Sequence, residues 1–566
     1  MSEYFIKFAD LLSRLAAEMK KIQFFIALVL MVAAVFVAMG FFTFKNADKQ
    51  KNVLFQTDRA VEDIRFISAR PHSIEHPAER ARVRWYLHDR LEDMGGRPQI
   101  LYYDSIPCKS GGTINIADVY CKFEPEGRDT SDAYLMLVAH LDSRFTEHTP
   151  EGETLSYGAA DDGYGLATVL ELARGAISYA GEWNQGLKIL FTDAEEHDLD
   201  GMRYALERDN RIFDRTGLLI NIEARGVKGP AMLFETSDGN AALMDFYTEN
   251  AAMPYAYSLT SVIYGMMPNY TDFTPARRLF PGYNFSVIDN LDYYHNSRDC
   301  FSNIHPESIA HYGVQLEPML RKYLTDEEYA DTQYFRSDSD RVVFTVPGIS
   351  TFCLTREGNW ILNASVLIMF VIAMLLYIGF GRAGFGKILS NAFWISVTGI
   401  LAGGAATGVV WAATKIAGVP FSFTSTKYLQ WDWILALAVI AVMLVAYTVF
   451  FRHKARKSEN FVFEHLLGLM LLMLVISGVL LFTVGENFFL VFPAACAIAA
   501  LLLHVILYLN ILSLPALLLA ELAFLPFLYN IYTALTVGAL GAVVFLAFLY
   551  TVMTASLVRC YMNQRR

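Results

Sequence analysis

The position of the long uncharged runs constrains this 566-residue chain more than any other feature. One run covers residues 23–43, and nearly continuous apolar sequence resumes at about residue 360. Most charged residues lie before about residue 345. About 20 apolar residues suffice for a helix that crosses the hydrocarbon core of a bilayer. The chain is therefore expected to combine a water-soluble part with a part embedded in lipid, and its hydrophobic content of 54% fits that division.

The apolar runs divide the chain into five expected segments. They are a cytoplasmic N-terminus (1–22), an uncleaved transmembrane signal anchor (23–43), an extracytoplasmic domain (44–345), about seven transmembrane helices (360–556) and a cytoplasmic tail (557–566). The seven runs in the fourth segment cover residues 360–380, 388–412, 431–451, 463–484, 488–508, 511–529 and 532–556. With the signal anchor, the sequence predicts about eight spans.

Basic residues indicate which side of the membrane each loop occupies, because cytoplasmic loops carry an excess of Lys and Arg. An even number of spans places both termini on one side. The loops on that side contain Lys7, Arg14, Lys20, Lys21, Arg382, Lys387, Arg452, Lys454, Arg456, Lys457, Arg559, Arg565 and Arg566. The opposite short loops contain little besides Lys415 and Lys427. The domain at 44–345 should therefore lie outside the cytoplasm.

Two locations satisfy this topology. The compact loops and short N-terminus favour a bacterial inner membrane with a periplasmic domain. The alternative is a eukaryotic organelle membrane with a lumenal domain, with which the sequons at Asn269 and Asn284 are compatible. Cys108 and Cys121 flank an expected hairpin and could form a disulfide outside the cytosol, and the alternative is two free thiols.

Charge and composition bear on several other classes of function. A formal net charge of −11 gives no electrostatic reason to expect nucleic-acid binding. The six cysteines include no CxxC pair, which argues against a zinc knuckle. Within the apolar runs, Glu521 and His504 are ionisable, but one acid and one histidine make a weak proton relay. Anchoring or packing is therefore the expected role of the membrane segment.

Polar side chains follow three strand-like segments of the soluble part, which alternates strands and helices. Residues 133–139 lead into His140 and Asp142, 187–193 into Glu195 and Glu196, and 218–222 into Glu223. In open α/β sheets, ligands bind beyond the carboxyl ends of the strands, where the strand order reverses. The pattern predicts an α/β domain with a mixed central sheet, helices on both faces and a metal site at this edge.

Other residues could complete such a site. Asp161 lies beside an acid in the glycine-rich segment GAADDGYG, where a carboxylate could bridge two cations. One member of the Glu195–Glu196 pair could bind metal while the other removes a proton from a metal-activated water. His295, on the loop LDYYHNSRD, is a candidate ligand. The HExxH zinc helix is absent from the sequence.

These segments in this order resemble the M28 family of zinc exopeptidases. The matching segments are HLDS, GAADDGYG, DAEEHDLDG, NIEARG and YYHNSRD, within about residues 60–325. The extended segments RPHS (70–73) and 221–240 resemble the membrane-bound branch of that family. The resemblance implies a zinc exopeptidase-like fold, two Zn²⁺ ions per chain, peptide substrates and a lipid bilayer as surroundings. A homo-oligomer is compatible with it.

The resemblance also implies individual roles. His140 and Glu223 would bind one zinc, Glu196 and His295 the second, and Asp161 would bridge both. Glu223 departs from many soluble relatives, which have Asp there. Other roles follow for residues that are not ligands: Asp142 would orient His140, Glu195 would be the general base and acid, Tyr294 would stabilise the tetrahedral intermediate, and Asp272 would lie near the substrate.

The expected activity is hydrolysis of N-terminal residues from peptides, with Glu195 as the general base. A carboxypeptidase or a glutaminyl cyclase on the same fold is an alternative enzyme, and the number of zinc ions per chain would help to separate these. A non-catalytic receptor or a subunit associated with a transporter is an alternative of another class. Substrate preference does not follow from the sequence.

Overall fold

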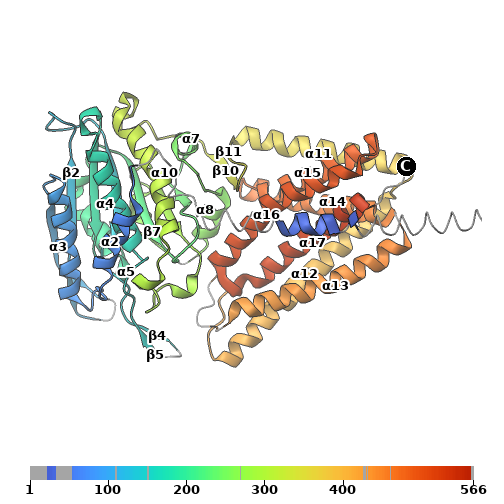
Figure 1. The fold of residues 1–566 in the computed structure, drawn as a ribbon, viewed down its shortest axis with the longest axis horizontal. Coiled ribbons are helices and arrows are strands. Elements are labelled where there is room, and N and C mark those ends of the chain that lie inside the picture. Colours follow the sequence, from blue (N-terminus) through green and yellow to red (C-terminus); the bar gives the residue numbers. More distant parts are fainter. Residues whose placement is uncertain are drawn as a thin grey trace, which may run out of the picture. The chain divides into compact units, whose positions relative to one another are not determined.

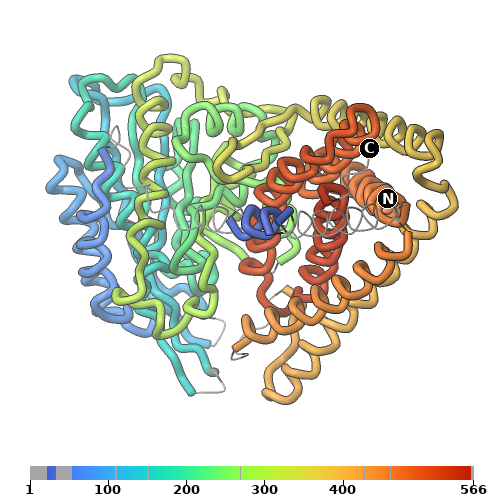
Figure 2. Tube along the Cα trace, turned by 45° about the vertical axis from the view of Figure 1, so that its right-hand side comes forward, coloured from blue at the N-terminus to red at the C-terminus, as the bar shows by residue number. Residues whose placement is uncertain are grey.

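The computed structural model describes residues 22–23, 25–33, 54–108, 111–149, 152–267, 269–424, 429, 431–458 and 460–562. They fall into two compact units, which we describe separately (Figures 1 and 2). The soluble unit contains the described residues from 54 to 345 together with Ile349–Arg356. The apolar unit contains the described residues 22–23 and 25–33, Val346–Gly348 and those from Glu357 onward. Much of the expected signal anchor at 23–43 lies outside the described residues. Its described part, residues 23 and 25–33, is helical.

A seven-stranded mixed sheet forms the middle of the soluble unit (Figure 1). Its spatial order is β1-β2-β6-β3-β7-β9-β8. The strands are β1 (Gln99–Pro107), β2 (Thr113–Phe123), β3 (Tyr134–His140), β6 (Gly186–Thr192), β7 (Thr216–Ala224), β8 (Met232–Thr236) and β9 (Gly282–Val287). Strands β6, β3, β7 and β9 are parallel, whereas β2 and β8 run antiparallel to their neighbours β6 and β9.

Helices cover both faces of this sheet, because its central strands are apolar on both sides. Along β3, Leu135 and Leu137 belong to the core under α2, α3, α4 and α10, whereas Met136 and Val138 belong to the core under α6 and α9. These helices are α2 (Thr57–Ile67), α3 (Pro77–Asp93), α4 (Gly163–Ile177), α6 (Asp200–Arg208), α9 (Phe273–Ala276) and α10 (Pro306–Thr325). The predicted fold class, a mixed central sheet with helices on both faces, is confirmed.

The remaining elements of the soluble unit are short. They are β4 (Glu147–Thr149), β5 (Gly152–Thr154), α5 (Glu195–Asp198), α7 (Ala241–Asn250), α8 (Ser258–Gly265), β10 (Arg341–Val346) and β11 (Ser350–Thr355). Cys108 and Cys121 are both free thiols in this structure, although the sequence left a disulfide between them open.

The order of the strands creates a crevice at one edge of the sheet. Strand β3 lies between β6 and β7, so the chain passes from β3 to β6 on one side and then crosses to β7 on the other. At such a point the connections leave the sheet in opposite directions and open a space beyond the carboxyl ends of the strands. The polar residues that follow β3 and β6, and Glu223 near the end of β7, therefore meet at this edge.

The apolar unit is helical. Its helices are α11 (Arg356–Gly379), α12 (Phe385–Ala417), α13 (Asp432–Lys457), α14 (Asn460–Thr483), α15 (Phe488–Leu507), α16 (Ser513–Leu535) and α17 (Leu540–Met562). By length and hydropathy the described residues contain six candidate membrane spans, the last of which, Asn510–Met562, contains both α16 and α17. The chain is therefore an integral membrane protein. His504 bonds through Nδ1 to the Tyr377 hydroxyl at 2.6 Å, which ties α15 to α11.

Candidate metal centre

The structure brings the five predicted ligands together at the carboxyl edge of the sheet. His140 ends β3, Asp161 precedes α4, Glu196 lies in α5 just after β6, Glu223 lies near the end of β7, and His295 lies on the loop after β9. They form two groups that share Asp161: His140 with Asp161 and Glu223, and Asp161 with Glu196 and His295. Within each group, one ligand atom per residue lies within 4.8 Å of the others.

The distances within each group fit a cation of the size of zinc. His140 Nε2 lies 3.2 Å from Asp161 Oδ1 and 3.5 Å from Glu223 Oε2. His295 Nε2 lies 3.3 Å from Asp161 Oδ2 and 3.1 Å from Glu196 Oε1. Tetrahedral zinc with bonds of about 2.0–2.1 Å separates its ligands by about 3.3 Å. The two oxygens of Asp161 thus face the two groups, as a bridging carboxylate requires.

Burial also favours a metal. The five ligand side chains are buried, and Asp161 Oδ2, Glu196 Oε1 and His295 Nε2 form no hydrogen bond of good geometry among the described residues, although the nitrogen lies 3.3 and 3.1 Å from the two oxygens. Buried polar atoms are rarely left in this state, because each costs about 1–3 kcal/mol. Imidazole and carboxylate are a donor set that suits zinc. The residues present therefore fit a pair of divalent cations, and their role as ligands stays a prediction.

The carboxylates of the centre govern its titration. Burial lowers the pKa of His140, but Glu223, Asp142 and Asp161 together raise it well above its usual value. Burial also lowers the pKa of His295, but Glu196, Asp161 and Glu147 outweigh this effect and raise the pKa to about 9. Both imidazoles are thus driven to carry positive charge. Cation binding needs neutral imidazole nitrogen, so it would exchange these protons for metal charge.

Glu195 lies beside the ligands but differs from them in exposure. Its side chain is partly exposed, whereas the adjacent Glu196 is buried. Burial of the carboxyl group, followed by the charges of Glu223 and Glu196, raises the pKa of Glu195 well above its usual value. Ala194 and Leu199, on either side of the short helix α5, adopt left-handed backbone conformations with φ of 58° and 57°. Such backbone conformations cluster at functional sites.

Asp142 connects the two parts of the centre. Its Oδ1 accepts the amide N–H of Glu195 at 3.0 Å, and its Oδ2 accepts that of Glu196 at 3.3 Å. The Nδ1 atom of His140 lies 2.9 Å from the Asp142 carbonyl oxygen and 3.5 Å from its carboxylate. One residue therefore fixes both the ring of a predicted ligand and the turn that presents the predicted base.

Buried ion pairs also hold the turn between β6 and α5 in place. Asp193 directly follows β6 and accepts a hydrogen bond from Arg84 Nη2 at 2.7 Å, while Arg80 Nη1 lies 3.2 Å from its other oxygen. Both arginines belong to α3, so this helix holds the end of β6 in place.

Three acidic or basic residues of the centre were not found from the sequence. Arg144 donates to Glu196 Oε2 at 3.0 Å, and Glu147 Oε1 lies 3.4 Å from His295 Nδ1. Asp299 accepts the amide N–H of Ala160 at 2.7 Å and that of Asp161 at 3.3 Å. Arg144 stands in a polar loop and Glu147 begins the short strand β4, and neither belongs to a sequence pattern of its own. Asp299 stands in the matching segment YYHNSRD, which was a usable signal.

A chain of buried hydrogen bonds ends on Glu223. Asn221 Nδ2 donates to Glu223 Oε1 at 3.1 Å and to Asn284 Oδ1 at 3.0 Å. Asn284 Nδ2 donates to Glu235 Oε2 at 3.0 Å, and Arg277 Nη1 donates to Glu235 Oε1 at 2.5 Å. Asn221 and Asn284 have no exposed surface. Because Asn221 engages Oε1, the other oxygen of Glu223 is the one directed at His140.

Two further predicted residues occupy distinct positions. The Tyr294 ring stacks on the His295 ring with centres 3.5 Å apart, and Tyr294 is partly exposed. Asp272 has no exposed surface and accepts a hydrogen bond from Thr192 Oγ1 at the end of β6. Burial raises the pKa of Asp272 to about 7. Asp272 thus supports the sheet edge in this structure, and its contact with substrate stays a prediction.

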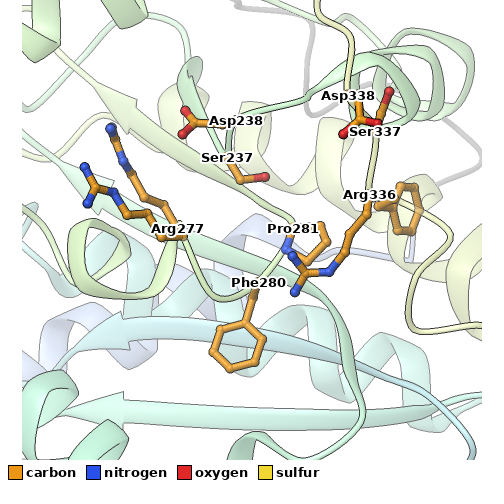
Figure 3. A pocket seen from close by; sticks show the side chains of 10 residues that line it. Ser237, Asp238, Arg277, Phe280, Pro281, Arg336, Ser337 and Asp338 are labelled. Carbon is orange, nitrogen blue, oxygen red and sulfur yellow. The ribbon is translucent and has the colours of Figure 1, made fainter.

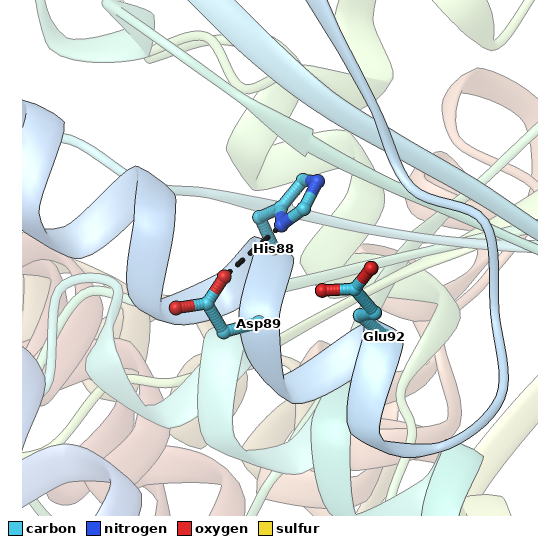
Figure 4. A group of neighbouring side chains, drawn as sticks. All are labelled: His88, Asp89 and Glu92. Carbon is cyan, nitrogen blue, oxygen red and sulfur yellow. Dashed lines mark hydrogen bonds and ion pairs between the residues drawn. The ribbon is translucent and has the colours of Figure 1, made fainter.

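Two other features are separate from this centre. A cavity of about 530 Å³ is lined by residues around 237–238, 277–281 and 335–338, and none of them is a predicted ligand (Figure 3). Arg277 lines this cavity and also donates to Glu235, so it connects the cavity to the hydrogen-bond chain that ends on Glu223. A third group of potential ligands, His88, Asp89 and Glu92, lies on α3 (Figure 4). Because both acids are exposed and His88 Nδ1 lies 3.1 Å from Asp89, this group resembles an ordinary helix surface.

Comparison with known proteins places these observations in a family. Residues 118–320 match the profile of Peptidase family M28. The endoplasmic reticulum metallopeptidase 1 of Mus musculus is 26% identical over 59% of this chain and 34% of its own length. The vacuolar membrane protease of Schizosaccharomyces pombe is 27% identical over 56% of this chain and 36% of its own length. The chain thus covers about a third of these relatives.

Solved structures also align with the chain. A Zn-dependent exopeptidase from Parabacteroides distasonis aligns with 47% of this chain and 98% of its own, with 20% identity and a TM-score of 0.38. A glutaminyl cyclase from Porphyromonas gingivalis aligns with 48% of this chain and all of its own, with 18% identity and a TM-score of 0.39.

The relatives also bear on location. Both curated relatives are named for eukaryotic organelles, the endoplasmic reticulum and the vacuole. They agree with the eukaryotic alternative, and the preference for a bacterial periplasm gains no support from them. The profile match covers β3, β6, β7 and β9 and all five predicted ligands. Residues 118–320 therefore carry a peptidase domain of family M28, in a chain that is similar to membrane-bound proteins and contains candidate membrane spans.

Proposed function

We propose that this chain is a membrane-bound dizinc aminopeptidase that removes N-terminal residues from peptides outside the cytoplasm. The observation that carries the proposal is the pair of three-residue groups that share Asp161, with Glu195 beside them. His140, Asp161 and Glu223 would hold one zinc, and Asp161, Glu196 and His295 the other. When bound, the two ions supply Lewis-acid activation of a water molecule and of the scissile carbonyl.

The residues of the chain perform the proton transfers. Glu195 accepts a proton from the attacking water and returns it to the leaving amine. The amide N–H of Glu195 donates to the Asp142 carboxylate, and this hydrogen bond keeps Glu195 in place. Tyr294, which stacks on His295, would donate a hydrogen bond from its hydroxyl group to the oxygen that becomes negative in the tetrahedral intermediate.

The test compares full-length protein in detergent with its Glu195→Gln variant. We expect two zinc ions per chain in both proteins by mass spectrometry of the metal, and turnover of aminoacyl coumarin amides only in the wild type. The loss should be at least 100-fold, the lower range for a general base. Retained activity with retained zinc would show that Glu195 is not the base.

The same assay separates the alternatives. A carboxypeptidase would cleave N-blocked peptides, and a glutaminyl cyclase would release ammonia from N-terminal glutamine without cleaving a peptide bond. A receptor or transporter subunit would do neither and would respond to none of these substrates.

A further inference from the structure

The cavity in Figure 3 lies at the opposite edge of the sheet from the metal centre and has no role in the function proposed above. Pro281 lines it, and β9 begins at the next residue, Gly282. The predicted ligands instead lie towards the carboxyl ends of the parallel strands. The cavity volume of about 530 Å³ is typical of sites that bind small molecules.

Hydrogen bonds join the three chain segments that enclose this cavity. The amide N–H of Ser237 donates to the Gly282 carbonyl at 3.1 Å, and Ser237 Oγ accepts the amide N–H of Gly282 at 3.1 Å. Arg336 Nη2 donates to the Leu279 carbonyl at 2.5 Å. The segments around residues 237, 281 and 336 are therefore held against one another, and the cavity does not need a ligand in order to form.

Two phenylalanines give the cavity an apolar wall. Phe335 is 2% exposed, and its ring stacks on those of Tyr323 and Tyr329 with centres 6.2 and 5.6 Å apart. The Phe280 ring stacks on the Phe213 ring with centres 5.4 Å apart. Because the core fixes both rings, they offer a preformed surface to an apolar side chain of a ligand.

Charged side chains of both signs line the rest of the cavity. They are Arg277, Arg278, Arg336, Asp238 and Asp338. Arg278 and the two aspartates are exposed, and their side chains form no ion pair or hydrogen bond within the part of the chain that the structure describes. An arginine in this state can bind a carboxylate, and an aspartate can bind an ammonium group. A ligand with both charges suits this lining better than a simple anion, which the aspartates would repel.

Arg277 belongs both to this cavity and to the hydrogen-bond chain that ends on Glu223. Its Nη1 donates to Glu235 Oε1 at 2.5 Å. The other oxygen of Glu235 accepts from Asn284, which is bonded to Asn221. The Nε and Nη2 atoms of Arg277 form no hydrogen bond among the described residues. A ligand carboxylate can therefore bind these donors and compete with Glu235 for the guanidinium group.

We propose that the cavity binds the ammonium and carboxylate groups of an amino acid or short peptide, and that its occupant acts on the metal centre through Arg277. The carboxylate would contact Arg277 and Arg278, the ammonium group one of the two aspartates, and an apolar side chain the aromatic wall. Competition for Arg277 weakens the bond that anchors Glu235, and with it the chain that orients Glu223. Amino acids and peptides are product and substrate of the proposed aminopeptidase, so the regulatory meaning rests on that function, whereas binding does not.

Binding is measured on full-length protein in detergent after removal of zinc, so that the ligand cannot bind to metal. The probes are radiolabelled phenylalanine and diphenylalanine in equilibrium dialysis. N-acetylphenylalanine and phenylalanine amide, which each lack one charge, are competitors. The variants are Arg278→Met and Asp238→Asn, and the control is Arg211→Met, which alters an exposed arginine outside the cavity. Thermal unfolding verifies that each protein is folded.

We expect Arg278→Met and Asp238→Asn each to weaken phenylalanine binding about fivefold, the upper value for a solvent-exposed ion pair, and Arg211→Met to leave it unchanged. Each singly charged competitor should be weaker than phenylalanine by a similar factor. Tighter binding of diphenylalanine would identify a peptide as the occupant, and tighter binding of phenylalanine an amino acid. The proposal is overturned if neither probe binds, if N-acetylphenylalanine competes as well as phenylalanine, or if both cavity variants bind like the wild type.

The effect on the metal centre is measured as zinc affinity with and without phenylalanine. We expect phenylalanine to lower the affinity for one zinc at least fivefold in the wild type and in Arg211→Met. The effect should be smaller in Arg278→Met, which binds less phenylalanine, and absent in Asn221→Leu, which interrupts the chain. Phenylalanine that binds zinc in solution would affect all proteins alike, so equal changes in all of them, or none in the wild type, would overturn the coupling. These measurements involve no hydrolysis, whereas a wild-type protein without peptidase activity would contradict the proposed function alone.

Discussion

Replacing Asn221 by leucine tests whether the buried hydrogen-bond chain positions a metal ligand. Leucine has nearly the same shape but removes the donor to Glu223 Oε1 and to Asn284 Oδ1, at 3.1 and 3.0 Å. Both acceptors are buried, and each one left without a donor costs about 1–3 kcal/mol. Loss of a partner that orients a ligand typically weakens metal binding about 10- to 100-fold. We therefore expect Asn221→Leu to lower both stability and the affinity for one zinc.

The control for this variant is Gln315→Leu. Gln315 is as buried as Asn221 and donates to the Ala231 carbonyl at 2.7 Å, but it contacts no predicted ligand among the described residues. Equilibrium dialysis with metal analysis gives the two zinc affinities, and thermal unfolding gives stability. We expect both variants to lose stability and Asn221→Leu alone to lose affinity at one of two sites. If both variants keep two zinc ions with wild-type affinities, Asn221 has a purely structural role.

Two further predictions concern stability. Burial lowers the pKa of His311 to about 3, from 6.5 in the unfolded chain, so the unfolded state binds the proton first as the pH falls. The free energy of unfolding should therefore decrease from pH 6.5 towards pH 3 by up to about 1.4 kcal/mol per unit from this group, and urea midpoints of His311→Gln should show a shallower decline. If the slopes match, another group causes the decline. Removal of zinc by a chelator should lower the melting temperature, because ligand at 100-fold excess over Kd contributes about 2.7 kcal/mol per site, and added zinc should restore it. An unchanged melting temperature would argue against metal in the buried groups.

The sequence predicted the positions that strand periodicity determines. His140 is the last residue of a buried strand, Glu196 lies in the short helix that follows another, and Glu223 lies on a third, so an apolar run that leads into polar residues was sufficient to locate them. Parallel strands then bring their carboxyl ends to one edge. The fold class followed from the same alternation of strands and helices. The ligand roles themselves stay predictions, although the distances favour them.

The parts that were missed depend on loops and on tertiary contacts. Glu147 lies near His295, which is distant in the sequence, and no local pattern links these residues. Arg144 was missed for the same reason. Asp272 was expected near substrate because of its segment, but its burial depends on how α9 packs against the end of β6. Loop conformation is set by many weak contacts rather than by one periodicity, so a single sequence contains little information about it.

The burial of Asn284 has a consequence for how this protein can mature. Asn284 heads the triplet Asn-Phe-Ser, yet its side chain lies within β9 with no exposed surface and bonds to Asn221 and Glu235. A sugar chain attached there during synthesis could not fit between β7 and β8 and would remove a donor from the chain that ends on Glu223. If the protein is made in a compartment where oligosaccharides are transferred to nascent chains, β9 can therefore take its place in the sheet only in molecules whose Asn284 is unmodified.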